Sequence, residues 1–207
     1  RLLLKQYQDC PRRMIRVQGT LVDTELCQAL LDELERWSKR HFQNTRPSID
    51  AQSYMILRSP IEFEQKDSNM ARKAAKKLQK NMELWNLAKR AIESVDAEYA
   101  ERFSALAVTM GFIGSPHIDK QNTGPFYGLS LGNFLDGTGG VCVEADYLTV
   151  AHVNTKNQMG KVDGRYPHWV APYTGTRYSL IYYSTWQEYQ QPGPAFFGKV
   201  VEEHFDQ

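Results

Sequence analysis

Two histidines and one aspartate in the second half of the chain are the residues most able to do chemistry together. His117 and Asp119 lie two positions apart, between two runs of strand-forming residues. Side chains at positions i and i+2 of an extended chain point to the same side, so this pair can bind one ion. A distant histidine would complete two histidines and one carboxylate on one face of an octahedron, which suits iron(II) with open positions for cosubstrate and O₂. We predict that His168 is this third ligand.

A second histidine, His152, competes for the same place. It lies in the strand-like run YLTVAHV, but the arginine after it, Arg165, lies in the loop-like KVDGRYP. An anchor in that loop would be poorly placed, so we interpret His152 as a strand residue beside the sheet. His41, on an expected helix, and His204, in the polar C-terminal tail, have no partner in the sequence.

Arg177 and Ser179 open the strand-like segment RYSLIYY. The planar guanidinium fork suits a bidentate pair with a carboxylate, which a lysine cannot reproduce. Ser179 lies two positions further on, so its hydroxyl can add a hydrogen bond from the same face of the strand. We predict that the two residues bind the carboxylate of a cosubstrate.

The elements that must position these residues are β-strands. Beyond residue 104, short apolar runs alternate with glycine-rich turns, such as DGTGG at residues 136–140. This pattern predicts a jelly roll, the double-stranded β-helix, over residues 104–190.

Residues 1–103 are expected to be a mostly helical support region. Apolar residues recur at steps of three and four from Thr24 to about Phe42, and again from Asp67 to Tyr99, which predicts helices. The run SYMILR at residues 53–58 predicts a strand. The fold class is therefore α+β, a jelly roll with supporting N-terminal helices, and residues 1–207 are expected to form a single domain.

Composition excludes several kinds of partner. With 25 Lys+Arg against 24 Asp+Glu, the formal net charge is +1, so an anionic partner must meet a local patch. Cys10, Cys27 and Cys142 form no CxxC pair, which indicates reduced thiols inside the cell and no disulfide-linked partner. No apolar run approaches the ~20 residues of a membrane span. The start at Arg1, without a methionine or signal pattern, indicates an excised domain or processed fragment.

In their order, the HxD motif, the GG hairpin, the distal histidine and the RxS strand resemble the iron(II)/2-oxoglutarate-dependent dioxygenase superfamily over residues 104–186. Within it, the chain looks most like the TET and base-J-binding-protein branch of 5-methylpyrimidine oxygenases, which includes algal TET-like enzymes. This rests on HIDKQN, an HxDxxN pattern, on the next strand-like run GLSLGNF, on Asp163-Gly164 before His168, and on GTRYS around Arg177.

The resemblance implies an Fe(II)- and 2-oxoglutarate-dependent dioxygenase that hydroxylates a C–H bond of 5-methylcytosine or thymine in DNA. His117, Asp119 and His168 would bind the iron, and Arg177 and Ser179 the cosubstrate. Ascorbate stays open as an alternative cosubstrate. Asn122 would contact a flipped-out base, and the aromatic rings of Tyr166 and Trp169 are available to stack on it. A DNA substrate would imply a nuclear location.

Three alternatives stay open. Asn122-Thr-Gly-Pro is also typical of an ordinary turn. The basic run from Lys66 to Lys80, expected on one helix, could track phosphates or simply be a solvated face. The substrate could instead be a protein side chain or a small metabolite, and a jelly-roll module without metal is the non-enzymatic alternative.

Overall fold

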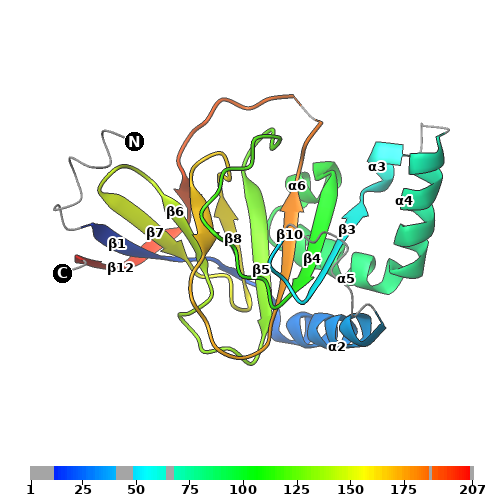
Figure 1. The fold of residues 1–207 in the computed structure, drawn as a ribbon, viewed down its shortest axis with the longest axis horizontal. Coiled ribbons are helices and arrows are strands. Elements are labelled where there is room, and N and C mark those ends of the chain that lie inside the picture. Colours follow the sequence, from blue (N-terminus) through cyan, green and yellow to red (C-terminus); the bar gives the residue numbers. More distant parts are fainter. Residues whose placement is uncertain (1–11, 41–48, 64–67, 187, 206–207) are drawn as a thin grey trace.

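Two β-sheets face each other, and helices cover the outer face of the larger one (Figure 1). The structure is a computed structural model and describes residues 12–40, 49–63, 68–186 and 188–205. The smaller sheet has the strand order β12-β1-β7-β6-β9, and the larger has the order β11-β8-β5-β10-β4-β3, with β2 paired to β8. Neighbouring strands are antiparallel, except that β1 and β7 are parallel. The expected jelly roll is confirmed.

The strands are β1 Arg13–Gln18, β2 Thr20–Leu21, β3 Ser53–Arg58, β4 Ala105–Met110, β5 Phe126–Gly132, β6 Val141–Glu144, β7 Thr149–Val153, β8 Gln158–Val162, β9 His168–Val170, β10 Arg177–Tyr183, β11 Phe196–Phe197 and β12 Lys199–Phe205. The helices are α2 Thr24–Arg40, α3 Pro60–Phe63, α4 Asn69–Lys80, α5 Met82–Glu93 and α6 Ala97–Arg102.

Alternation along strand β10 separates two hydrophobic cores. Leu180 and Tyr182 pack in the larger core, which the helices α2, α4, α5 and α6 form with the outer face of the larger sheet. Ile181 and Tyr183 pack in the core between the two sheets. Because strand side chains alternate between faces, Arg177 and Ser179 also face the space between the sheets.

The expectation of a mostly helical region up to residue 103 was wrong at its start. Strand β1 lies in the middle of the smaller sheet, between β12 and β7. Strand β12, which lies beyond residue 190, pairs with β1, so His204 sits opposite Met14 in a sheet and not in a tail. The jelly roll is therefore built partly from residues outside 104–190, because its pairings join the two ends of the chain.

The helical region expected from Asp67 to Tyr99, as a helix with a second helix or a bent continuation, consists of α4, α5 and α6. At Asn81 the backbone leaves the helical region (φ −124°, ψ 30°), and its side-chain amide donates to the Lys77 carbonyl at 2.8 Å. Asp96 accepts from the Tyr99 N–H at 2.9 Å and so begins α6. Helix α2 and strand β3 are confirmed, whereas Cys10, His41, Phe42, Lys66 and Asp67 lie outside the described residues.

In the part of the chain that the structure describes, no helix has both the length and the apolar character needed to cross a bilayer. Cys27 and Cys142 are buried free thiols.

Candidate metal centre

Backbone hydrogen bonds bring the HxD motif and the distal histidine together. His117 and Asp119 lie in the connection between β4 and β5, and His168 begins β9. The His117 N–H donates to the His168 carbonyl at 3.0 Å, and the His168 N–H donates back at 2.9 Å. The Asp119 N–H donates to the Gly164 carbonyl at 2.7 Å, which attaches the motif to the turn before β9.

The three side chains converge on one point. One donor atom from each of His117, Asp119 and His168 lies within 4.8 Å of the others. The Nε2 atoms of the two histidines are 3.8 and 3.7 Å from the two carboxylate oxygens of Asp119. Atoms bound at about 2.1 Å to one ion are about 3 Å apart, so small side-chain movements would bring all three within bonding distance.

Hydrogen bonds to carbonyl groups set the tautomers of both rings. His117 Nδ1 lies 2.6 Å from the Ser115 carbonyl, and His168 Nδ1 lies 3.0 Å from the Tyr166 carbonyl. Because a carbonyl can only accept, each Nδ1 carries the proton and each Nε2 has a free lone pair, as a metal ligand requires. Burial lowers the pKa of His168, against the opposing effect of the Asp119 charge, which favours the neutral ring.

Asn122 and Gly164 hold the Asp119 carboxylate. Asn122 is buried and donates from Nδ2 to Asp119 Oδ2 at 3.0 Å. One N–H of its amide therefore holds Asp119, and the predicted contact to a base would use its carbonyl or its second N–H. A Cβ at Gly164 would lie 2.8 Å from Asp119 Oδ2 and 3.0 Å from the ring of Phe126, so only glycine lets the carboxylate lie against this turn.

We expect Gly164→Ala to weaken metal binding by about tenfold, because the added methyl group must push the Asp119 carboxylate aside. Titration of the purified variant with Co²⁺, read by absorbance, measures this. The matched control is Gly128→Ala, whose Cβ would meet only Thr155 Cγ2 at an ordinary 3.7 Å and should leave metal affinity unchanged. Equal affinity in both variants would show that the close approach at Gly164 does not position Asp119.

Arg177 is a buried cation, and the part of the chain that the structure describes gives it no carboxylate partner. Its side chain is 2% exposed and lies against the rings of Phe134 and Tyr173. It donates from Nη1 to the Ser179 hydroxyl, while its Nε finds no hydrogen-bond partner among residues 12–40, 49–63, 68–186 and 188–205. Among the described residues, no carboxylate forms an ion pair with it. Burial lowers its pKa to about 10, so the group stays charged at neutral pH and requires an anion.

Tyr183, at the other end of β10, also lines the space between the sheets, and the sequence analysis did not include it among the site residues. It packs in the core between the sheets, on the same strand face as Arg177 and Ser179. Burial raises its pKa to about 12, and the nearby Tyr54 and Asp119 act in the same direction. The i, i+2 pattern from Arg177 through Ser179 would have identified it.

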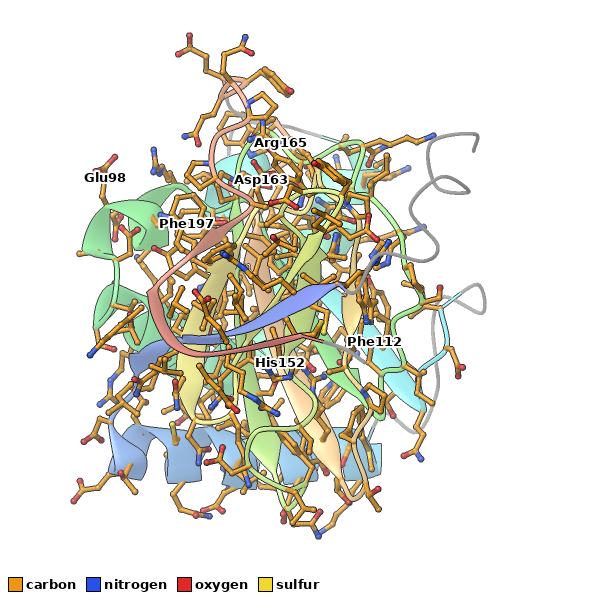
Figure 2. The ribbon with its side chains drawn as sticks, turned by 90° about the vertical axis from the view of Figure 1, so that its left-hand side faces the viewer. Glu98, Phe112, His152, Asp163, Arg165 and Phe197 are labelled. Atoms are coloured by element: carbon orange, nitrogen blue, oxygen red, sulfur yellow. The ribbon has the colours of Figure 1, made fainter. Side chains whose placement is uncertain are left out.

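His152, the alternative third ligand, lies on the opposite face of the smaller sheet from His168. On β6, Cys142 pairs with His152 and Val143 pairs with His168, and neighbouring residues of a strand face opposite sides. His152 is therefore remote from the three converging side chains. Figure 2 shows it well away from Asp163 and Arg165, which flank the Gly164 turn.

The same alternation corrects the prediction for Trp169. This residue pairs with Cys142 and packs in the outer cluster with Val150 and Ala171, so it cannot stack on a group held beside His168. Tyr166 packs at the edge of the core between the sheets, and its hydroxyl donates to the Gly193 carbonyl at 2.8 Å. The ring of Phe126, 5.4 Å from that of His168, is the aromatic neighbour of the ligand.

No protein-family model matches the sequence, and no curated protein is significantly similar to it. Many solved structures are similar to it, and three of them illustrate the identity and coverage. The first, NgTET1 in complex with 5mC DNA, has 15% identity and a TM-score of 0.48, over 83% of this chain and 72% of that one. A Trichoplax adhaerens prolyl hydroxylase, solved with a hypoxia inducible factor peptide, has 12% identity and a TM-score of 0.45 over 88% and 87%. A Pseudomonas putida prolyl-4-hydroxylase has 14% identity and a TM-score of 0.45 over 89% and 99%.

The molecule is thus a jelly roll with a cluster of two histidines and one aspartate beside the core between its sheets, and a buried arginine on the strand that faces the same space.

Proposed function

We propose that this protein is an Fe(II)- and 2-oxoglutarate-dependent dioxygenase that hydroxylates a C–H bond. The observation that carries the proposal is the convergence of the His117, Asp119 and His168 donor atoms, with both Nδ1 atoms committed to carbonyl groups. Two neutral imidazoles and one carboxylate are the ligand set that suits iron(II) with open positions.

The chain also fits the cosubstrate. Arg177 and Ser179 would hold the far carboxylate of 2-oxoglutarate, because the guanidinium is buried, charged and without a carboxylate partner among the described residues. Phe134 and Tyr173 flank the guanidinium and exclude water from it. A dicarboxylate satisfies this site better than ascorbate, which is a lactone and carries no carboxylate group.

Bound Fe(II), 2-oxoglutarate and O₂ would supply the oxidation, in which one oxygen atom enters the substrate C–H bond and the other enters succinate as CO₂ leaves. The residues of the chain would orient the metal ion and the cosubstrate and shield them from water. His117, Asp119 and His168 would hold the ion, Asn122 holds the Asp119 carboxylate, and Arg177 would bind the far carboxylate of the cosubstrate. Holding reactants in a productive geometry is the main contribution of such a site.

For the substrate, we propose a 5-methylpyrimidine in DNA, presented by base flipping. Helix α4 contains Arg72, Lys73, Lys76, Lys77 and Lys80 and no acidic residue. Four of these are exposed, whereas Lys77 is half-buried and its pKa is lowered by burial and by Arg58. Such a face can neutralise phosphates. A DNA substrate would place the enzyme in the nucleus.

The test incubates the purified protein with iron(II), O₂ and either 2-oxoglutarate or ascorbate on methylated and unmethylated DNA, and measures nucleosides by mass spectrometry. We expect a 5-hydroxymethylpyrimidine together with an equal amount of succinate. If methylated DNA stays unchanged while a peptide or metabolite is hydroxylated, the DNA substrate is wrong and the oxygenase stands. If no substrate stimulates succinate formation and no iron binds, the oxygenase itself is wrong.

We expect that replacing Lys73, Lys76 and Lys80 by glutamine will weaken binding to all DNA sequences alike and reduce the salt dependence by about one unit of slope for each phosphate that is no longer neutralised. Fluorescence anisotropy across salt concentrations measures both. Replacing the exposed Glu83 and Arg90 of α5 by glutamine provides a control with no change of net charge. An unchanged salt slope in the triple variant would mean that α4 does not contact phosphates.

A further inference from the structure

Residues 188–195, which we call the strap, form an exposed segment without helix or strand. Figure 1 shows the chain leaving the end of β10, arching over that edge of the two sheets and descending to β11. Seven of its eight residues are exposed, so little apolar burial holds it in place.

Hydrogen bonds from the two ligand-bearing loops hold the strap instead. On the side of the HxD motif, the Gln190 N–H donates to the Thr123 carbonyl at 2.8 Å. On the side of the turn before His168, the Asp163 N–H donates to the Ala195 carbonyl at 2.9 Å. The Tyr166 hydroxyl also donates to the Gly193 carbonyl. The strap therefore connects the loop of Asp119 with the turn of His168.

An ion pair within that turn provides the most specific of these contacts. Asp163 is fully buried and accepts from Arg165 Nε at 2.8 Å and from Nη2 at 2.6 Å. The remaining Nη1 donates to the Gln190 carbonyl, and the guanidinium lies 5.1 Å from the centre of the Tyr189 ring. Figure 2 shows Asp163 and Arg165 next to each other in this region.

We propose that Asp163 and Arg165 are positioning residues for the metal centre, which clamp the strap to both ligand-bearing loops and thereby hold Asp119 and His168 in a geometry ready for the ion. This rests on the proposed metal site. All three guanidinium nitrogens of Arg165 form hydrogen bonds, two to Asp163 and one to the Gln190 carbonyl of the strap. A buried ion pair adds little stability compared with apolar residues of similar size, so its value here lies in the single arrangement that it specifies.

The clamp acts through short connections. Gly164 lies between Asp163 and Arg165. Its carbonyl accepts a hydrogen bond from the Asp119 N–H, and its Cα lies close to the Asp119 carboxylate. Tyr166, the residue after Arg165, orients the His168 ring through its carbonyl. A shift of this turn by a few tenths of an ångström would therefore move two ligands at once.

The experiment compares the wild-type chain with Arg165→Lys, which keeps the charge and loses the fork. Titration with Co²⁺, read by its absorbance spectrum, gives affinity and coordination geometry without turnover. We expect affinity to fall by about tenfold or more, with a changed spectrum, because partners of ligand-bearing groups commonly have effects of this size. Arg36→Lys, which carries the same substitution in the Glu33 pair on α2, is the matched control and should behave as wild type.

Limited chymotrypsin digestion of the same proteins tests the strap itself. Trp186 and Tyr189 are exposed, and cleavage after them is located by mass spectrometry. We expect faster cleavage in metal-free Arg165→Lys than in wild type, and slower cleavage of the wild type when Co²⁺ is added, because coupling between two sites is reciprocal. If Arg165→Lys misfolds, Tyr189→Ala, which removes the side chain over the guanidinium and with it one cleavage site, should show a weaker loss of Co²⁺ affinity and faster cleavage after Trp186.

The outcomes separate the two proposals. Normal Co²⁺ affinity and normal cleavage in Arg165→Lys would overturn the clamp and leave the metal site standing. Failure of the wild-type protein to bind Co²⁺ or iron would overturn both, whatever the cleavage rates.

Discussion

Replacement of His117, Asp119 or His168 by alanine is expected to abolish iron binding and reduce succinate formation to background in every case. Each variant leaves two ligands where the ion requires three, and the loss should be all or none because the remaining donor atoms cannot fill the same face. Iron content after dialysis and turnover of 2-oxoglutarate measure the effect. Metal at a hundredfold excess over its dissociation constant should stabilise the wild type by ~2.7 kcal/mol and the variants by nothing.

His152→Ala is the matched control for this series. His152 and His168 are both buried strand histidines with lowered pKa values, but they face opposite sides of the smaller sheet. We expect His152→Ala to keep iron and activity. If it loses iron while His168→Ala retains it, the assignment of the third ligand is wrong.

Arg177→Lys and Arg177→Met are expected to raise the 2-oxoglutarate requirement far more than the substrate requirement. Loss of a charge-assisted bidentate contact in a dry site should cost about 2 to 4 kcal/mol, or about thirty- to a thousand-fold in apparent affinity. Initial rates at varied cosubstrate and substrate concentrations separate the two requirements, and iron affinity without cosubstrate provides the internal control.

Thermal unfolding distinguishes an anchor from a structural residue. Because Arg177 is buried without a carboxylate partner among the described residues, Arg177→Met should not lower the melting temperature of the cosubstrate-free protein and could raise it. The same variant should lose the stabilisation that 2-oxoglutarate gives to the wild type. A large drop in melting temperature together with an unchanged 2-oxoglutarate requirement would show that Arg177 serves the fold.

Spacing along the chain was sufficient to select the side chains that the structure brings together. His117 and Asp119 are two residues apart, and His168 differs from His152 in having an arginine on a strand, not in a loop, a few residues after it. Arg177 and Ser179 could be paired for the same reason, since period-two alternation is a local property of any strand. The helix from Thr24 and the strand at residues 53–58 were equally local, because each depends on an uninterrupted apolar period.

The faces of the smaller sheet could not be determined in this way. All five residues of β7 are buried, so its sequence shows no alternation between polar and apolar positions that would indicate the inner side. The face of His152, on β7, became clear only from its pairing with Cys142, whereas Trp169 follows His168 directly on β9, so local alternation alone places it on the opposite face. Strands β1 and β12 were missed because each is stabilised by a partner at the other end of the chain.

The sequence alone therefore determined which residues could bind a metal and a carboxylate, because residue type and local period decide donor chemistry and the side of a strand. Tertiary structure alone decided what surrounds them. It commits Asn122 to Asp119, leaves Arg177 without a counterion among the described residues, and brings the strap against Asp163 and Arg165. These contacts join residues far apart in the chain, and their energies depend on burial and on paired geometry, which no local pattern encodes.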